Sequence, residues 1–381
     1  MNEEQRMKSI KNPSKSRHET ALDYQQPNRI GSHVDHIYKL KHGIYCPPIQ
    51  VEVSPTSICQ QECRFCYTYE REHTNMLEDQ VMIDFFSNAS DMGIETIYIC
   101  GTGEPLVNKA LPDAIVAGGK TDIKLGLNTN GVLFTEKVQR KTLEHFTYVK
   151  FSVFESDAKR YAVNHGCKED QYHQLVKNIE HATNYRSKID AGVSLFATIY
   201  IDNENFYDAY EIVKFCKSIG LDFVGLQGPA TFTEFSPDGR KKMVVCDSKD
   251  QIEQLKERVQ TLEDDDFKVF MTFTEVDNEK IQNKKLWKKD FCQGVNLVGV
   301  ISGDGEVYPC WRAWGNHELS YGNLHDQSFT DIWKGERRQE VNKIIYSTPP
   351  SGDECQVCKI YVNNVNLDKI LNNTNKWSNI L

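Results

Sequence analysis

The sequence predicts an α/β fold in which six parallel strands alternate with helices and curl into a partial barrel. Six short apolar segments between residues 49 and 226 have the length and composition of strands, and helical periodicity follows each of the first five. Alternating strands and helices favour parallel pairing with right-handed crossovers. Six such units can close part of a barrel, and the ligand site then lies at the carboxyl ends of the strands.

The remaining elements are placed around this barrel. The predicted strands span residues 49–53, 95–100, 123–127, 148–154, 191–201 and 223–226, and the predicted helices span 78–92, 108–117, 135–145, 168–185 and 204–219. Ahead of the first strand, Ser32 to His42 has the spacing of a short amphipathic helix, and Cys46-Pro47-Pro48 breaks it.

Five segments follow from this pattern. Residues 1–48 are expected to form a partly disordered N-terminal extension, 49–230 the barrel, 231–287 a linker region with a helix (250–262) and a strand (268–273), 288–362 a small cysteine-containing domain, and 363–381 a tail. Within the small domain, Gly303-Asp304-Gly305 between two apolar runs, 296–301 and 306–308, predicts a hairpin. A helix is predicted over 329–341.

Composition narrows the possible functions. The 381 residues carry 45 basic and 54 acidic side chains, a net charge of −9, which argues against a general affinity for nucleic acid. No apolar run approaches membrane-spanning length, and the polar residues 1–17 lack a signal-peptide stretch. A cytoplasmic protein without membrane or nucleic-acid partners is expected. Its twelve cysteines then favour metal ligation over disulfides.

The strongest chemical signal is a group of three cysteines directly after the first strand. Cys59, Cys63 and Cys66 form a C-x3-C-x2-C pattern in a polar loop, where core packing does not explain them. Closely spaced thiolates suit zinc or an iron–sulfur cluster. Structural zinc takes four protein ligands, and the nearest further candidate, His73, lies seven residues on. Three thiolates on a four-iron cluster would leave one iron open.

This pattern resembles the signature of the radical S-adenosylmethionine (radical SAM) enzymes. The resemblance implies a 4Fe–4S cluster on the three cysteines, whose fourth iron binds the amino and carboxylate groups of SAM. An electron from the cluster cleaves SAM to methionine and a 5′-deoxyadenosyl radical. It also implies a (β/α)6 partial barrel, in agreement with the strand and helix pattern, and an electron donor such as flavodoxin or ferredoxin.

A second segment, after the second strand, strengthens the resemblance. Glycines in Gly101-Thr102-Gly103-Glu104-Pro105 permit close backbone approach to a ligand, and Glu104 supplies an acceptor for an ammonium group. The segment is similar to the family's GGEP motif, which holds the amino group of SAM. Thr102 stands where the motif has its first glycine, whereas Gly103, Glu104 and Pro105 match.

Four further residues are SAM-binding candidates by resemblance. Asn128 and Asn130 lie in Leu127-Asn-Thr-Asn-Gly131, although Asn-Gly is also a common turn. Ser152 lies on the fourth strand, where alternate residues of any barrel point inward. Phe65 occupies the aromatic position before the third cysteine, next to the adenine in the family.

Four cysteines in the C-terminal domain indicate a second site. Cys292, Cys310, Cys355 and Cys358 would suit a zinc ion with four thiolate ligands or a fully ligated cluster. Their spacing, the hairpin and Tyr308-Pro-Cys-Trp311 resemble the SPASM/twitch extension of radical SAM enzymes. Because no cysteine follows Cys358, the resemblance is to the twitch form with one auxiliary 4Fe–4S cluster, as in the aminocyclitol dehydrogenases of butirosin biosynthesis.

Five cysteines lie outside both groups. Cys100 and Cys216 are in apolar patterns and are expected in the core. Cys46, Cys167 and Cys246 are in polar stretches. Radical SAM epimerases use a thiol as hydrogen donor, for which Cys246 is the first candidate and Cys167 the second, although an inert loop cysteine is the commoner outcome.

The expected activity is hydrogen abstraction from a small molecule such as a sugar, an aminocyclitol or a related polyol, followed by oxidation. No residue is assigned a catalytic role on the substrate. Two alternatives remain open. One is a radical epimerase or a maturase acting on a peptide or protein, which would need a partner. The other is a non-enzymatic module that binds zinc through four cysteines, which would lack the visible absorbance of a cluster.

Overall fold

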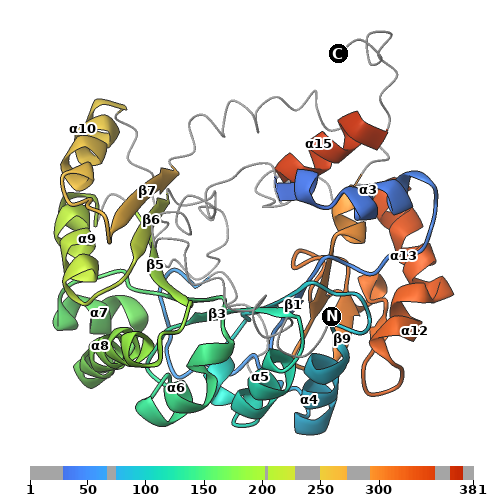
Figure 1. Ribbon diagram of the computed structural model, residues 1–381, viewed down its shortest axis with the longest axis horizontal. Helices are drawn as coiled ribbons and strands as arrows, with labels where there is room; N and C mark the ends of the chain where they lie inside the picture. Colours follow the sequence, from blue (N-terminus) through green and yellow to red (C-terminus); the bar gives the residue numbers. More distant parts are fainter. Residues whose placement is uncertain are drawn as a thin grey trace.

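A ten-stranded sheet organises the part of the chain that the structure describes (Figure 1). The computed structural model describes residues 29–66, 74–201, 205–227, 249–272, 292–347 and 361–371. Figure 1 shows the sheet bent into an open arc, with helices along its outer side. Within the described residues no helix is both long and apolar enough to cross a membrane.

The strands follow in the order β10-β9-β8-β1-β2-β3-β4-β5-β6-β7. All neighbours from β8 to β7 pair in parallel, whereas β9 and β10 are antiparallel. Their bounds are β1 Gln50–Val53, β2 Thr96–Ile99, β3 Lys124–Thr129, β4 Tyr148–Phe151, β5 Ser194–Tyr200, β6 Phe223–Gln227, β7 Lys268–Thr272, β8 Val298–Ile301, β9 Glu306–Tyr308 and β10 Gly322–Asn323.

Helices connect the strands and line the outer side of the arc (Figure 1). The α-helices are α3 Val34–Lys41, α4 Asp79–Asn88, α5 Leu111–Gly119, α6 Glu136–Thr142, α7 Ala158–His165, α8 Glu169–Ile189, α9 Ala209–Ser218, α10 Lys249–Gln260, α12 Phe329–Lys334, α13 Glu336–Ser347 and α15 Tyr361–Leu371. Short 3-10 helices are η1 Arg29–Ser32, η2 Pro105–Val107, η3 Leu143–His145, η4 Phe206–Asp208, η7 Gln293–Asn296 and η8 His317–Leu319.

The α/β prediction and all six predicted barrel strands are confirmed, but the sheet is wider than six strands. The predicted linker strand becomes β7 and pairs in parallel with β6, and the first strand of the predicted hairpin becomes β8 and pairs with β1. The helix predicted over residues 329–341 is instead two helices, α12 and α13, which meet at Gly335. Helices α7 and α15 were not predicted.

Successive side chains of a strand point to opposite faces of the sheet, and each face has its own buried cluster. One set of side chains, represented by Val51, Ile97 and Leu125, packs outward against the helices in the main hydrophobic core. On the opposite face of the sheet, Phe196, Phe223 and Phe270 form a separate buried cluster. The Phe196 and Phe223 rings stack with centroids 4.2 Å apart, and Tyr148 packs against them. The inner face of the arc therefore has an aromatic floor.

The described part of the N-terminal extension packs on the C-terminal domain. Ile30 of η1 and Ile37 of α3 lie in one buried cluster with Leu297, Val298 and Leu367 of α15. This cluster is separate from the core beneath the sheet. Residues 29–41 thus pack against the amino end of β8.

Candidate active site

The site forms where the segments after β1, β2 and β3 meet at one edge of the sheet. Because these strands are parallel and in register, their carboxyl ends lie side by side. The cysteine loop follows β1, the glycine-rich segment follows β2, and the Asn-Thr-Asn segment ends β3. The sequence motifs are thereby brought together by the fold.

The cysteine loop is anchored at its base. Thr56 Oγ1 donates to the carbonyl of Asn75 (2.8 Å) and accepts from the amide of Ile58 (3.0 Å). Cys59, Cys63 and Cys66 are half-buried and not in disulfides. Burial raises the pKa of the Cys59 thiol to about 11 and lifts that of Cys63 above its ordinary range. The thiols of Cys59 and Cys63 therefore keep their protons until a metal centre displaces them.

Three closely spaced cysteines have the chemistry of iron–sulfur cluster ligands. Among the residues that the structure describes, no three His, Cys, Asp or Glu side chains converge closely enough to hold one metal ion. Ligands of a 4Fe–4S cluster bind different irons, so they surround a volume instead of meeting at a point. Cys59, Cys63 and Cys66 are accordingly the residues that would hold the cluster.

The glycine-rich segment packs directly on the cysteine loop. A Cβ on Gly103 would overlap the backbone of Ser57 and Ile58, and one on Gly101 would overlap the Ser54 side chain. The amide of Glu104 donates to the carbonyl of Ile58 at 3.0 Å. Glycine is required here because only a residue without Cβ lets the two backbones approach so closely.

Glu104 is buried and holds the end of β3. Its carboxylate accepts from Thr129 Oγ1 (2.6 Å), from the amide of Asn130 (2.7 Å) and from its own turn at Leu106 (3.2 Å). Burial raises the pKa of Glu104 to about 7, while the three donors act in the opposite direction. A bound ammonium group would add a fourth partner that favours the carboxylate.

Asn130 connects the β3 segment to the cysteine loop. Its Oδ1 accepts from Gln60 Nε2 (3.0 Å), and its Nδ2 lies 4.0 Å from the sulfur of Cys59. The resemblance predicts Asn130 as a SAM-binding residue. In the structure, both polar atoms of its side chain face residues of the cysteine loop.

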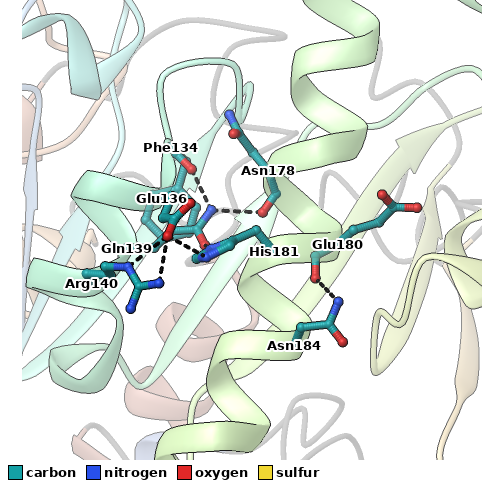
Figure 2. A network of polar contacts seen from close by, with 8 residues as sticks. All are labelled: Phe134, Glu136, Gln139, Arg140, Asn178, Glu180, His181 and Asn184. Carbon is teal, nitrogen blue, oxygen red and sulfur yellow. Dashed lines mark hydrogen bonds and ion pairs between the residues drawn. The ribbon is translucent and has the colours of Figure 1, made fainter.

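A polar network in the helical layer fixes the chain that follows Asn130 (Figure 2). Asn178 of α8 donates through Nδ2 to the carbonyls of Gly131 and Val132 (2.8 and 2.9 Å). Gln139 of α6 donates to the carbonyls of Phe134 and Asn178 (2.6 and 2.8 Å), as Figure 2 shows. Buried amides of two helices thus support the loop that carries Asn130.

The remaining predicted SAM-binding residues lie around this centre. Asn128 is on the inner face of β3, and its Oδ1 is buried without a hydrogen-bond partner among the described residues. Such an orphaned acceptor fits a ligand hydroxyl or amine. Ser152 follows β4, and its amide donates to the carbonyl of Thr129 (3.0 Å). Phe65 packs on Phe154 with ring centroids 4.6 Å apart.

His165 is a site residue that sequence reasoning missed. It ends α7, is 1% exposed, and places Nδ1 3.3 Å from the sulfur of Cys63 and 3.2 Å from Gln61 Oε1. Burial lowers the pKa of His165 to about 3, which keeps the imidazole neutral. No local motif marks this histidine, since α7 brings it to the loop from about one hundred residues away.

Part of the C-terminal cysteine site is described. Cys292 precedes η7 and accepts a long hydrogen bond from Asn364 Nδ2 of α15 (3.6 Å). Cys310 follows β9 and, like Trp311 and Trp314, packs against the buried cluster of Val300, Tyr308 and Ala313. The other two predicted ligands, Cys355 and Cys358, lie outside the described residues.

The other cysteines differ partly from expectation. Cys216 is buried as predicted, but Cys100 at the end of β2 is only half-buried. Cys46, expected in a polar loop, is buried because the preceding helix α3 folds over it. Its sulfur lies 3.6 Å from Nε2 of His36. Cys167 is half-buried in the α7–α8 connection, 3.9 Å from Gln61 Nε2. Cys246 lies outside the described residues.

Comparisons with known proteins agree with both sites. Residues 53–216 match the family model of the Radical SAM superfamily, and residues 292–359 match that of an iron-sulfur cluster-binding domain, SPASM. The tungsten-containing aldehyde ferredoxin oxidoreductase cofactor-modifying protein of Pyrococcus furiosus is 24% identical over 305 residues, which cover 74% of this chain and 80% of that protein.

Two solved structures share the fold. The structure of SuiB from Streptococcus suis bound to S-adenosylmethionine has a TM-score of 0.62 at 18% identity, covering 87% of this chain and 78% of SuiB. The structure of anSMEcpe with bound AdoMet has a TM-score of 0.55 at 15% identity, covering 84% of this chain and 89% of that one.

Proposed function

Because the chain is a radical SAM enzyme with a SPASM domain, we propose that it oxidises a small polar molecule such as a sugar, an aminocyclitol or a related polyol. When bound, the reduced cluster and SAM supply a 5′-deoxyadenosyl radical that removes a hydrogen atom from the substrate. The observation that carries the proposal is the direct packing of the glycine-rich segment, through Gly103, on the loop of Cys59, Cys63 and Cys66.

The chain's own residues bind and orient the reactants. Cys59, Cys63 and Cys66 would hold the cluster, and Glu104 would accept a hydrogen bond from the SAM ammonium. Asn128 and Ser152 offer polar groups for the carboxylate or ribose, and Phe65 offers a ring for the adenine. Holding the reacting carbon beside the radical and excluding water is the protein's main contribution.

The inner face of the sheet favours a small polar substrate. Thr198 Oγ1 on β5, like Asn128 Oδ1, is buried without a hydrogen-bond partner among the described residues. The buried aromatic side chains of Phe196 and Phe223 lie on the same inner face of the sheet. Buried polar atoms over an aromatic floor are typical of a site that orients a hydroxyl- or amine-bearing molecule.

Oxidation is favoured over epimerisation by the second cysteine site. Cys292, Cys310, Cys355 and Cys358 would hold an auxiliary cluster that supplies a one-electron acceptor, so that after hydrogen abstraction the substrate could lose one electron and one proton. Cys167, a candidate hydrogen donor, packs on the hydrophobic core beneath the helices and beside Gln61.

Peptide modification is the second candidate, because SuiB, which shares the fold, is also known in complex with its precursor peptide SuiA. Against it, residues 29–41 pack on Leu297 and Val298 and are not a separate peptide-binding module. The name of the Pyrococcus furiosus relative, which describes a cofactor-modifying protein, agrees better with a small molecule.

A metabolite comparison tests the substrate class. A strain carrying Cys63→Ala should accumulate a polyol-like compound that the wild type consumes. That compound is then given to the purified enzyme in deuterated water, with SAM and reduced flavodoxin or ferredoxin. A product two mass units lighter, without carbon-bound deuterium, is expected. An isomer one mass unit heavier would show thiol donation and epimerisation instead, and accumulation of an unmodified peptide would support the second candidate.

A further inference from the structure

We propose that His165 is a positioning residue for the barrel cluster. Its Nδ1–H donates a hydrogen bond to the sulfur of Cys63 and so raises the reduction potential of the cluster that this thiolate holds. The proposal rests on the proposed function, because it takes Cys59, Cys63 and Cys66 as cluster ligands.

The end of α7 is fixed to the cysteine loop by backbone contacts. The amide of Glu62 donates to the carbonyl of His165, and the amide of Arg64 donates to that of Asn164, both at 3.0 Å. Gly166 adopts a left-handed conformation with φ of 55°, and a Cβ there would press on the backbone of Glu62. His165 is therefore held against the loop on either side of Cys63.

Aromatic neighbours fix the imidazole ring itself. Tyr161, one turn earlier in α7, stacks on it with ring centroids 3.9 Å apart and planes 15° from parallel. Phe65 meets the imidazole edge-on at 5.2 Å. The ring is fully enclosed, so its nitrogens depend on protein partners.

Gln61 determines which ring nitrogen carries the proton. Its Nε2 lies 3.0 Å from Tyr161 Oη and 3.1 Å from Gln171 Oε1, so its Oε1 faces His165 Nδ1. A carbonyl oxygen only accepts, so Nδ1 is the protonated nitrogen. The other nitrogen, Nε2, has no partner among the described residues. Protonating Nε2 instead would bury a donor without an acceptor and would leave Nδ1 facing two acceptors without a hydrogen.

The same Nδ1–H reaches the sulfur of Cys63 at 3.3 Å. A thiolate ligand is acceptor-only, so the contact becomes an N–H···S hydrogen bond once Cys63 binds iron. Hydrogen bonds to cluster sulfurs help to set the reduction potential. The donor stabilises the more negative, reduced cluster more than the oxidised one, so its loss makes the cluster harder to reduce.

The test is a redox titration of the reconstituted holoenzyme followed by electron paramagnetic resonance. The barrel cluster is identified as the signal that changes when SAM is added. His165→Phe keeps a ring but removes the donor, and should lower the equilibrium constant for one-electron reduction about tenfold, which is about 59 mV. His165→Asn keeps an N–H near the position of Nδ1 and should stay close to wild type. His173→Phe, at an exposed histidine of α8, is the control.

Each outcome decides the proposal. A fully loaded His165→Phe enzyme with an unchanged potential would overturn it, as would equal shifts in the Phe and Asn variants. If the Phe variant takes up no cluster, pulsed resonance of wild type labelled with 15N-histidine decides. A nitrogen coupling that disappears in His165→Asn is expected, and no coupling in wild type contradicts the hydrogen bond. A wild-type enzyme without any SAM-responsive cluster would refute the proposed function itself.

Discussion

A buried carboxylate, Glu104, joins the three segments of the site. Its oxygens bind the hydroxyl of Thr129 and the amide of Asn130 at the end of β3, and its own amide binds the cysteine loop. A change at Glu104 therefore affects both ligand binding and local structure, and the two effects need different substitutions to separate them.

Glu104→Gln should weaken SAM binding and lower the melting temperature, because the amide NH2 would face the backbone amide of either Asn130 or Leu106. The amide keeps the shape and one acceptor oxygen, whereas the charge-assisted hydrogen bond to the SAM ammonium is lost, at a cost of about 1.5–3 kcal/mol. Isothermal titration of SAM into the reconstituted enzyme measures this as roughly a tenfold to hundredfold weaker affinity. The control is Glu136→Gln on the exposed face of α6.

Glu104→Ala should lower the melting temperature further than Glu104→Gln, because all three buried donors lose their acceptor. Unchanged SAM affinity in the Gln variant would remove Glu104 from the binding site, whatever happens to the Ala variant.

At the scale of single residues, the sequence predicted the groups that lie in short motifs. Cys59 and Gly103 could be found because their chemistry requires a fixed local spacing. His165, Gln61 and Asn178 could not, because each acts through partners distant in the chain, and an isolated histidine or amide has no distinguishing neighbours.

At the scale of elements, an ion pair connects the helical layer to the sheet. Arg186 of α8 and Asp222, which precedes β6, are 5% and 4% exposed and meet at 2.5 Å. Asp222 also accepts from the amide of Leu195 on β5 (2.7 Å), and Arg186 donates to the carbonyl of Val193 (3.2 Å). One pair therefore ties α8 to the starts of two strands.

Arg186→Met should destabilise the protein by about 3–5 kcal/mol, because it leaves the Asp222 charge buried without its partner. Arg140→Met removes an exposed pair with Glu136 in α6 and should cost less than about 1 kcal/mol. Urea unfolding followed by circular dichroism compares the two variants. Equal losses would mean that the buried pair has no special role in holding the layers together.

Helix α7 shows why some elements escape prediction. It is short and buries only two side chains, one of them a histidine, so it has no recognisable hydrophobic spacing. Its boundary signals are nevertheless present. The Asp157 side chain caps the first turn by accepting a hydrogen bond from the amide of Arg160 (2.9 Å), and Gly166 ends the helix. Conversely, the predicted helix over 329–341 ignored Gly335, where α12 ends.

At the scale of the molecule, the sheet joins the two cysteine sites. Strand β8 pairs with β1, and the turn after it brings Gly303 against Thr56 and Asn75 at the base of the cysteine loop. Cys292 precedes β8 and Cys310 follows the antiparallel β9, so both lie toward the amino end of β8, whereas the cysteine loop follows the carboxyl end of β1. The pairing of β8 with β1 was not predictable, because periodicity reveals a strand but not the strand beside it.

Two separate sites predict two separable clusters. Anaerobically reconstituted protein should hold about eight irons and eight sulfides, if each site takes a four-iron cluster. Replacing Cys59, Cys63 and Cys66 with Ala should halve the content, and so should replacing Cys292, Cys310, Cys355 and Cys358. Iron and sulfide assays measure both. One zinc without sulfide in the C-terminal domain would contradict the auxiliary cluster.

The most direct test of the proposed function is whether the protein cleaves SAM through the loop of Cys59, Cys63 and Cys66. Reconstituted wild type, given SAM and dithionite without oxygen, should form 5′-deoxyadenosine and methionine in equal amounts, as chromatography with mass detection can show. The triple Ala variant should form neither, whereas the variant without C-terminal cysteines should retain the reaction. Formation of 5′-deoxyadenosine by the triple variant, or its absence from a wild type that carries the full cluster, would contradict the account.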